Sequence, residues 1–362
     1  MPDARDRGAP RARRAMHGSE FERIAALIAT LPRGEGVVVG PGDDAAVLRP
    51  REGRDLVVTT DTFVDGRHFR RDLVTPSEAG GRLAAANLSD LAAMAAEPRW
   101  AVMSLVVPAT WSAGDCLLLE RACARVLMAD GAAVVGGNLA SGDGAFSATV
   151  TLLGEVERDR AWKRAGAKPG DVIAVTGVPG SAAAFMALAL WGNLPSRTRA
   201  PGELAERFIA PASRVRLARA LAEAGGVHAA IDVSDGLAAD LGSMCDASGV
   251  GARVHEEWLP ADEPLRAAAR ALSAAAEEQR GALPAGEGAL LTHLQLGPSD
   301  DYELLLSVDA VAWGRCAQVA SVSGASLTRI GEVFEGAGLE CVARGGATRP
   351  LEPRGWDHFE AG

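Results

Sequence analysis

Asp55-Leu56-Val57-Val58-Thr59-Thr60-Asp61 is the stretch of this sequence that decides the fold. Its run of leucine, valine and threonine predicts a β-strand, which we expect to be buried, and the run ends on a carboxylate. Because α/β proteins commonly bind ligands at the ends of their strands, Asp61 is a candidate ligand.

Four further short segments also place carboxylates among glycine, serine, threonine or asparagine. They are Gly42-Asp43-Asp44, Asn87-Leu88-Ser89-Asp90, Asp232-Val233-Ser234-Asp235-Gly236 and Asp300-Asp301-Tyr302-Glu303. Carboxylates that converge on one cleft repel each other unless cations lie between them, and such hard oxygen ligands select Mg²⁺, Mn²⁺ or Ca²⁺. The pattern therefore indicates a protein that handles phosphates with magnesium.

The distribution of lysine sharpens this interpretation. The whole chain holds only Lys163 and Lys168, and no Gly-x-x-x-x-Gly-Lys-[Ser/Thr] stretch exists. The usual lysine cradle for nucleotide phosphates is therefore absent. If phosphates bind, metal ions and a few arginines must offset their charge.

Length and charge bound the class of protein. The 362 residues suit two domains of about 150 residues, and 48% hydrophobic residues are ample for two cores. The net charge of −10 argues against electrostatic binding to nucleic acid or to an anionic membrane. It does not exclude an anionic substrate, because metal ions can bridge the two.

Cysteine usage and hydropathy indicate a cytoplasmic protein. The five cysteines include no Cys-x-x-Cys pair, which favours reduced thiols. No apolar run approaches the ~20 residues that a membrane span needs. Residues 1–18 lack the apolar stretch of a secretory signal, and we expect them to form a flexible tail.

The hydrophobic pattern predicts a mixed α/β fold. Helices are expected over residues 19–31, 77–96, 112–129, 212–225 and 236–247, with an Ala-rich helix after Gly180-Ser181 and another helix with a mobile loop within residues 260–287. Strands are expected over residues 55–61, 100–107, 132–138, 145–156, 170–177, 229–233 and 301–308. Ser77 is the predicted N-cap of the second helix, which Pro98 ends.

Some of the polar positions have structural explanations as well as functional ones. Asn87 and Asp90 are three residues apart on a predicted helix, where they bind a ligand or cap a neighbouring loop. The turn at Gly180-Ser181 is a weak phosphate signal, since most such turns only pack a helix against a sheet. Ser234 and Asp235 lie at a strand-to-helix junction, where we expect free backbone N–H groups to favour anions.

The clusters, taken in order, resemble the thiamine-monophosphate kinases, a family within the ATP-binding superfamily that also contains aminoimidazole ribonucleotide synthetase. The family pattern includes Gly-Asp-Asp-Ala, Thr-Asp-Thr followed by His-Phe, Asn-Leu-Ser-Asp-Leu-Ala-Ala-Met, Gly-Ala-Lys-Pro-Gly-Asp, Asp-x-Ser-Asp-Gly-Leu, Glu-Asp-Tyr-Glu-Leu and a terminal Asp-His-Phe. This chain matches nearly all of them between about Gly18 and Phe359. One such motif would be weak, whereas seven in register are strong.

The resemblance implies direct, Mg²⁺-assisted transfer of the γ-phosphoryl group of ATP to thiamine monophosphate, which gives thiamine diphosphate. Matched residue by residue, the implied Mg²⁺ ligands are Asp44, Thr59, Thr60, Asp61, Asp90, Asp232 and Asp235, and Asp43 adjoins this set. Of these, the resemblance gives the central catalytic part to Asp44, Asp61, Asp90 and Asp235. The implied ATP contacts are Gly137, Asn138, Arg164 and Ser234, and the implied substrate contacts are His68, Asp300 and Trp356.

Two of the substrate candidates also have ordinary structural explanations. Trp356 either stacks on the thiamine rings or packs the C-terminus. His68 standing alone would more often be a structural hydrogen-bonding residue, although Asp61 and Asp65 lie close to it in the sequence.

The chain departs from the family pattern at two positions. Asn138 stands where the family usually has a metal-ligating aspartate, and an amide oxygen can still coordinate Mg²⁺ but removes one negative charge. Asp300 stands where the family usually has glutamate, and its shorter side chain shifts a substrate contact. These two residues alone support the alternative that the chain is a non-catalytic or differently specific ATP-binding homologue.

Other members of the superfamily and a generic Ca²⁺-binding protein fit less well. Selenophosphate synthetases carry a reactive cysteine or selenocysteine and a lysine near the N-terminus, and hydrogenase-maturation relatives end in cysteine. Here no cysteine precedes Cys116, no lysine precedes Lys163, and the sequence ends in Glu360-Ala361-Gly362. No Asp-x-[Asp/Asn]-x-[Asp/Asn]-Gly calcium loop occurs either.

The resemblance also implies an architecture. An N-terminal α/β domain over residues 19–157 would bind ATP and Mg²⁺ and pair its sheet with that of a second subunit, giving a homodimer. A C-terminal α/β domain over residues 158–359 would fold over the nucleotide, with the boundary between about Glu155 and Arg164.

Overall fold

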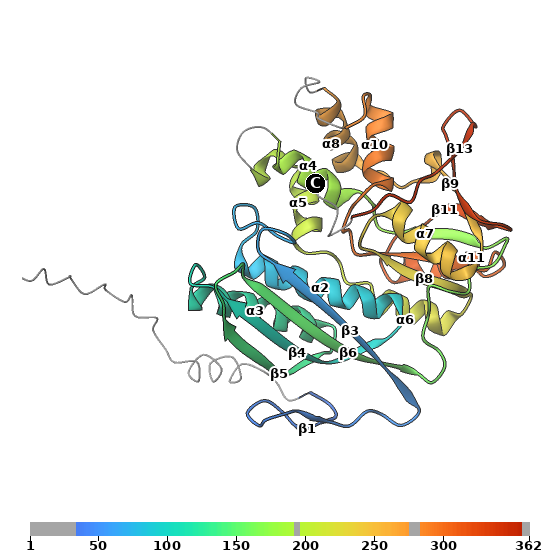
Figure 1. Ribbon diagram of the computed structural model, residues 1–362. Helices are drawn as coiled ribbons and strands as arrows, with labels where there is room; N and C mark the ends of the chain where they lie inside the picture. The colour runs from blue at the N-terminus through green and yellow to red at the C-terminus, as the bar shows by residue number, and fades with distance from the viewer. Residues whose placement is uncertain (1–33, 192–195, 275–282, 357–362) are drawn as a thin grey trace, which may run out of the picture.

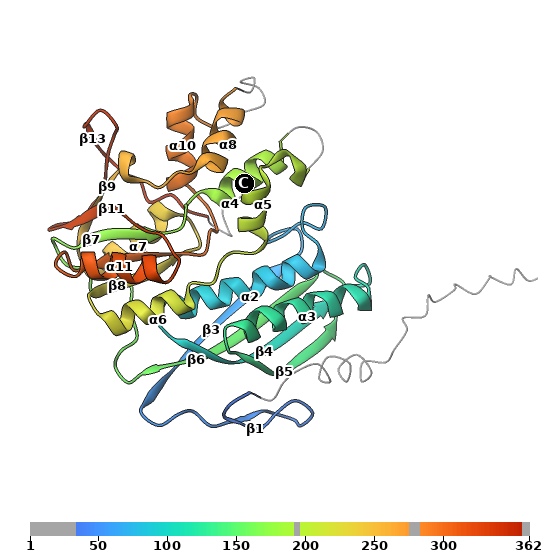
Figure 2. The same cartoon turned by 180° about the vertical axis from the view of Figure 1, so that it is seen from behind.

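The computed structural model of the chain (Figures 1 and 2) describes residues 34–191, 196–274 and 283–356. These residues form two α/β domains with mixed sheets, as the hydrophobic pattern predicts. The tail expected over residues 1–18 and the helix expected over residues 19–31 lie outside the described residues. No helix in the described ranges is long and apolar enough to cross a membrane.

The N-terminal domain is a four-stranded sheet with helices on one face. Its strand order is β3-β6-β4-β5, with β3 and β4 antiparallel to β6, and β5 parallel to β4. Figure 1 views the open face of this sheet, and Figure 2 shows α2 and α3 packed across the other face. The bounds are β3 (Arg54–Val64), α2 (Pro76–Ala93), β4 (Glu97–Val107), α3 (Ala113–Ala129), β5 (Ala133–Ser141) and β6 (Ser147–Glu157).

A two-stranded hairpin, β1 (Val37–Val39) and β2 (Val47–Leu48), precedes the sheet. In both views it lies below the sheet, on the side away from the C-terminal domain. The hairpin is anchored where the indole N–H of Trp100 donates to the carbonyl of Glu35 at 2.9 Å.

The expected strand over residues 55–61 exists as β3, but the prediction that it is buried is wrong. β3 lies at the edge of the sheet, and its side chains alternate between the helix-covered face and the open face. Leu56 and Val58 are 48% and 59% exposed on the open face. Asp61 lies on the other face, with the buried Phe63. An antiparallel sheet covered on one side gives this pattern.

The N-cap of helix α2 lies two residues before the predicted one. Thr75, and not Ser77, is the N-cap: its hydroxyl accepts the N–H of Glu78 at 3.3 Å, and the Glu78 carboxylate accepts the N–H of Thr75 at 2.8 Å. Pro76 fits the first helical position, where its missing N–H costs nothing. This reciprocal capping box fixes the start of the helix that carries Asp90.

The C-terminal domain contains a seven-stranded sheet of order β13-β12-β9-β11-β7-β10-β8. Its strands are β7 (Val172–Thr176), β8 (Val227–Val233), β9 (Gly251–His255), β10 (Glu303–Val308), β11 (Leu327–Phe334), β12 (Gly338–Val342) and β13 (Thr348–Pro350). Its helices are α4 (Ser181–Ala189), α5 (Gly202–Ile209), α6 (Val215–Ala224), α7 (Leu237–Ser248), α8 (Glu263–Ser273), α10 (Glu287–Leu296) and α11 (Trp313–Val322), with short 3₁₀ turns at Arg197–Arg199 and Glu256–Trp258. The loop expected within residues 260–287 falls partly outside the described residues.

Several elements of the two domains have no counterpart in the sequence-based prediction. These are the helices α5, α10 and α11, the strands β9, β11, β12 and β13, and the hairpin strands β1 and β2. Strand β9, for example, is a five-residue segment that begins with glycine and contains arginine and histidine, so its own propensity is weak. It becomes a strand because β11 and β12 pair with its two edges.

Helix α2 is the element that joins the two domains. It packs on β3 and α3 of its own domain and contacts α5, α6, β8 and β10 of the other. Farther down, Arg219 from α6 reaches Glu97 at 3.3 Å, and Glu97 also binds Arg51 at 2.8 Å. Because α2 contacts β8, side chains from both domains meet where α2 lies against the end of that strand.

Candidate functional site

Strand β3 and helix α2 bring the first two carboxylates together. The hydroxyl of Thr59 donates a short hydrogen bond to Asp90, and the charge of Asp90 acts on Asp61. Burial, with a smaller contribution from Asp90, raises the pKa of Asp61 to about 7. Burial also raises the pKa of Asp90, while the Thr59 hydrogen bond and the charge of Arg164 lower it. The sequence-predicted ligands Thr59, Asp61 and Asp90 thus share one site.

Strand β8 adds a third carboxylate from the other domain. Asp232 is 4% exposed and accepts the hydroxyl of Ser89, on α2, at 2.8 Å. Burial raises the pKa of Asp232 to about 8, and the negative charges of Asp90 and Asp61 add to the effect. Three carboxylates that burial and mutual repulsion hold toward the protonated state need cations before they can ionise together.

The junction between β8 and α7 does not present the free N–H groups that the sequence suggested. The carboxylate of Asp240, on the first turn of α7, accepts the N–H groups of Ser234, Asp235 and Gly236 at 3.1, 3.2 and 3.1 Å. This expectation was therefore wrong, because an internal carboxylate already occupies the backbone nest. Burial and the charge of Asp235 raise the pKa of Asp240 to about 6.

The turn before α4 is closed in the same way. Asp301 accepts the N–H groups of Gly180 and Ala182 at 2.6 and 2.8 Å, and the hydroxyl of Ser299 at 2.7 Å. The turn thus packs against the segment before β10, and its weak phosphate signal has a structural explanation. Burial raises the pKa of Asp301 to about 6.

The candidate substrate residues lie on three different segments. Asp300 forms an ion pair with Arg82 of α2. Trp356 is 54% exposed, and its backbone N–H donates to the backbone carbonyl of Asp235 at 3.0 Å, which holds this part of the C-terminal segment against the β8–α7 junction. The Nδ1 atom of His68 accepts the N–H of Val64 at 3.1 Å, and its ring stacks on Phe63.

Two of the predicted ligands face the opposite side of the N-terminal sheet. The Thr60 hydroxyl bonds Thr151 at 3.1 Å on the open face, away from Asp61. Asn138 also lies on that face, because the cross-strand row runs from Asn138 through Ser104 and Thr149 to Thr62. Three strand spacings, about 14 Å, separate β5 from β3.

Asp44 is also remote from the other carboxylates. It is exposed in the β1–β2 hairpin, and its own N–H bonds Asp43 at 2.9 Å. In both views the hairpin lies below the sheet, whereas α2 packs across the covered face of the sheet and β8 belongs to the C-terminal domain above it (Figures 1 and 2). Gly137 lies on β5 beside Met103, whose carbonyl leaves no room for a Cβ. A single chain therefore gathers only part of the predicted set.

The donor chemistry fits Mg²⁺, although the ligand set is incomplete. Carboxylate and hydroxyl oxygens are the ligands that Mg²⁺ prefers, and it usually keeps substrate phosphates and waters in its shell. Within the described ranges, no three His, Cys, Asp or Glu side chains are arranged to hold a metal ion by themselves. Asp61, Asp90 and Asp232 would therefore share the ions with phosphate oxygens and with ligands outside this cluster.

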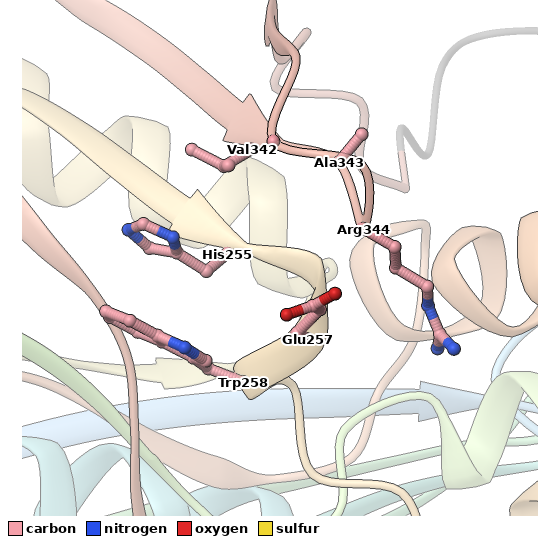
Figure 3. A pocket seen from close by; sticks show the side chains of 7 residues that line it. His255, Glu257, Trp258, Val342, Ala343 and Arg344 are labelled. Atoms are coloured by element: carbon pink, nitrogen blue, oxygen red, sulfur yellow. The ribbon is translucent and has the colours of Figure 1, made fainter.

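A surface hollow elsewhere in the C-terminal domain does not compete with this site. Figure 3 shows it beside His255, Glu257, Trp258 and Arg344. His255 stacks on Trp258 at 3.8 Å between ring centroids, and the Arg329 guanidinium lies 4.9 Å from the same ring. The hollow, of about 220 Å³, is below the ~300 Å³ of ordinary ligand pockets.

Three residues of the site had no role in the sequence analysis. They are Arg82, Asp240 and Tyr302. Arg82 had a usable signal, since a lone cation in an alanine- and leucine-rich helix needs a partner. Asp240 had none, because an aspartate in the first turn of a helix is common.

Comparisons with known proteins identify the family of this chain. Residues 42–156 match the model of the "AIR synthase related protein, N-terminal domain" and residues 168–343 that of the corresponding C-terminal domain. A thiamine-monophosphate kinase of Caulobacter vibrioides is 35% identical, over 94% of this chain and 91% of its own length.

The chain is also similar to solved structures of thiamine-monophosphate kinases. The crystal structure of thiamine-monophosphate kinase from Stenotrophomonas maltophilia K279a is 33% identical, with a TM-score of 0.72 over 89% of this chain and 95% of that one. A structure of AaThiL complexed with AMPPCP and TMP is 27% identical, with a TM-score of 0.69 over 94% and 97% of the two chains. Sequence, domain order and fold thus agree over nearly the whole length, and the chain belongs to the thiamine-monophosphate kinase family.

Proposed function

We propose that this protein transfers the γ-phosphoryl group of ATP to thiamine monophosphate and releases thiamine diphosphate and ADP. The observation that carries the proposal is the convergence of Asp61, Asp90 and Asp232 from three elements at the junction of two domains. Carboxylates held this close need bound cations to ionise together. The relatives that this chain resembles over most of its length are thiamine-monophosphate kinases. The protein is thus a phosphotransferase with a phosphate group as its acceptor.

The chain's own residues position and neutralise the reactants. Thr59 and Ser89 each donate a hydroxyl hydrogen bond to a carboxylate, which orients Asp90 and Asp232. Arg164, whose charge acts on Asp90, supplies a cation for the phosphates of ATP. Asp300 and Trp356 border the acceptor side. When bound, Mg²⁺ would offset the charge of the transferred group, which is the main task in phosphoryl transfer.

The working form in this proposal is a homodimer that pairs the open faces of the N-terminal sheets. Leu56, Val58 and Val106 are exposed on that face. Monomeric proteins rarely leave such an apolar face uncovered. Thr60 and Asn138 lie on the same face, so in this dimer both residues would lie at the subunit interface.

A cytoplasmic location also belongs to this proposal. The five cysteines are all buried and free, so the fold does not depend on disulfides. Reduced, structural thiols are typical of cytoplasmic proteins.

The deciding experiment is chromatographic. Purified protein is incubated with ATP, Mg²⁺ and thiamine monophosphate, with EDTA in a parallel sample, and thiamine diphosphate and ADP are quantified. We expect both products in equal amounts and only with Mg²⁺. Nucleotide binding without thiamine diphosphate would overturn the proposal and favour a homologue with another substrate.

A pair of variants tests the site itself. Asp61→Ala should abolish turnover, because it removes a carboxylate at the centre of the cluster. Asp55→Ala is the matched control: Asp55 lies at the start of the same strand, and among the described residues its carboxylate accepts the N–H of Asp159 alone, at 2.9 Å. Retained activity of Asp61→Ala at saturating Mg²⁺ would remove Asp61 from the metal site.

A further inference from the structure

A fully buried arginine links the two halves of the site. The Arg82 side chain is 0% exposed, and it extends from α2 to the segment before β10. A buried guanidinium is costly unless it is paired and hydrogen-bonded. The groups that bind the Arg82 guanidinium therefore indicate its role.

The partners of Arg82 belong to the C-terminal domain. Nη1 donates a short hydrogen bond to the carbonyl of Phe208, at the end of α5. Nη2 donates to the carboxylate of Asp300 and, at 3.3 Å, to its carbonyl. The guanidinium also lies over the Phe208 ring, 3.7 Å from its centroid, and 5.2 Å from that of Tyr302. Nε is buried without a partner.

The pairing leaves half of the Asp300 carboxylate available. Arg82 binds Oδ2, and within the described residues Oδ1 makes no hydrogen bond. The Asp300 side chain is 38% exposed, so Oδ1 can reach a ligand while the other oxygen is held.

The Arg82–Asp300 pair lies next to the metal-binding carboxylates. The charges of Arg82, Asp300, Asp61 and Asp232 all act on Tyr302. Tyr302 has a positive φ of 54° and donates its N–H to Val233 at the end of β8. A non-glycine residue in this conformation persists only where the surroundings impose it.

The spacing between Arg82 and Asp90 on α2 suggests what Arg82 does. Arg82 and Asp90 are eight residues apart on one helix, which corresponds to about 12 Å along its axis. One rigid helix thus carries both Asp90, in the carboxylate cluster, and Arg82, which binds Asp300. The distance between the metal site and Asp300 is then set by the helix and not by the loop that contains Asp300.

We propose that Arg82 is a positioning residue for the acceptor: it clamps Asp300 so that the free Oδ1 faces the amine or the cationic ring of thiamine monophosphate. This inference rests on the proposed function. The clamp is most needed in this chain, because aspartate reaches one methylene less far than glutamate and tolerates less misplacement.

Steady-state kinetics of four variants tests the proposal. They are Arg82→Lys, Arg82→Met, Asp300→Asn and the double variant Arg82→Met/Asp300→Asn. Arg82→Met should raise KM for thiamine monophosphate roughly tenfold or more and change KM for ATP less than about twofold. Arg82→Lys should be intermediate, because lysine keeps the charge but loses the planar fork. The double variant should be no worse than the worse single variant.

Arg99→Met is the matched control. Arg99 is also a buried arginine whose Nε makes no hydrogen bond within the described residues, although it lies 3.6 Å from the Glu155 carboxylate. Its other ion pairs go to Glu35 at 3.1 Å and Glu97 at 3.7 Å, at the far end of the N-terminal sheet. It should lower the thermal unfolding midpoint without a selective rise in KM for thiamine monophosphate. Thermal unfolding of each variant identifies those that fold.

The results distinguish a failure of the proposed role of Arg82 from a failure of the proposed kinase activity. If the wild-type protein makes thiamine diphosphate but Arg82→Lys and Arg82→Met raise both KM values together, the clamp is refuted and the kinase stands. Multiplicative effects in the double variant, or the same selective rise in Arg99→Met, refute the clamp equally. If the wild-type protein neither binds thiamine monophosphate in calorimetry nor phosphorylates it, the function and the inference both fail.

Discussion

Thr59 and Thr60 are neighbours in the chain, yet their side chains lie on opposite faces of β3. Thr59 donates to Asp90 on the helix-covered face, whereas Thr60 bonds Thr151 on the open face. The alternation of a β-strand requires this separation. One strand therefore serves the carboxylate cluster with one face and presents a candidate subunit interface with the other.

The Thr59 hydroxyl should matter for metal binding. Thr59→Val removes the donor that favours the ionised form of Asp90, so burial would raise the pKa of Asp90 further. We expect the Mg²⁺ concentration for half-maximal rate to rise roughly tenfold, as measured in a magnesium titration at pH 7.5. Thr62→Val, which loses a 2.8 Å bond to Thr149 on the open face, is the control. Equal shifts in both variants would contradict the role of Thr59.

The metal-free protein should lose stability as the pH rises. The folded-state pKa values are about 7 for Asp61 and about 8 for Asp232, both above the unfolded value of about 3.9. The stabilisation from their protonated forms is complete below the unfolded pKa and is lost as the pH rises through the folded values. Between pH 5 and pH 8 we expect a loss of several kcal/mol.

Differential scanning fluorimetry in EDTA, with and without restored Mg²⁺, checks this pH dependence. Magnesium should stabilise the protein more at pH 8 than at pH 5, because the carboxylates must be ionised to bind it. A stabilisation by Mg²⁺ that does not change with pH would mean that the ions bind elsewhere.

Asn138 should be a weakened metal ligand. Asn138→Asp restores a carboxylate on the open face of β5, and we expect a lower Mg²⁺ concentration for half-maximal rate. The same Mg²⁺ titration, at fixed ATP and thiamine monophosphate, measures the change. An unchanged or higher requirement would count against a metal role for this position.

Charge on the open face should break the dimer. Leu56→Arg and Val58→Arg place a cation where we expect two sheets to meet, so size-exclusion chromatography with light scattering should show monomers and little kinase activity. Leu118→Arg is the matched control, since Leu118 is 53% exposed on α3, on the covered side of the sheet. Dimers that persist in both β3 variants would exclude this interface.

Asp240 should hold the loop that carries Asp235. Asp240→Ala leaves the N–H groups of Ser234, Asp235 and Gly236 without their acceptor. We expect a loss of about 2–3 kcal/mol in urea unfolding and a raised KM for ATP. Asp240→Asn keeps one carbonyl oxygen and should lose less. Wild-type values for Asp240→Ala would show that solvent replaces the carboxylate.

The sequence by itself determined the class of fold and the chemistry. The apolar runs over residues 55–61, 145–156 and 229–233 predicted strands that exist, because their periodicity reports local burial. The oxygen-rich clusters indicated magnesium and phosphate, since ligand chemistry depends on residue type. Polar or short segments such as β9 were missed because pairing on both edges overrides their weak propensity.

Only the tertiary structure decided which of these residues meet. It brought Asp61, Asp90 and Asp232 together across two domains and separated Thr60 and Asn138 onto the open face. It also filled the nest at Ser234 with Asp240 and placed Arg82 against Asp300. These outcomes depend on strand register and helix packing between residues far apart in the chain, and no local pattern encodes such distances.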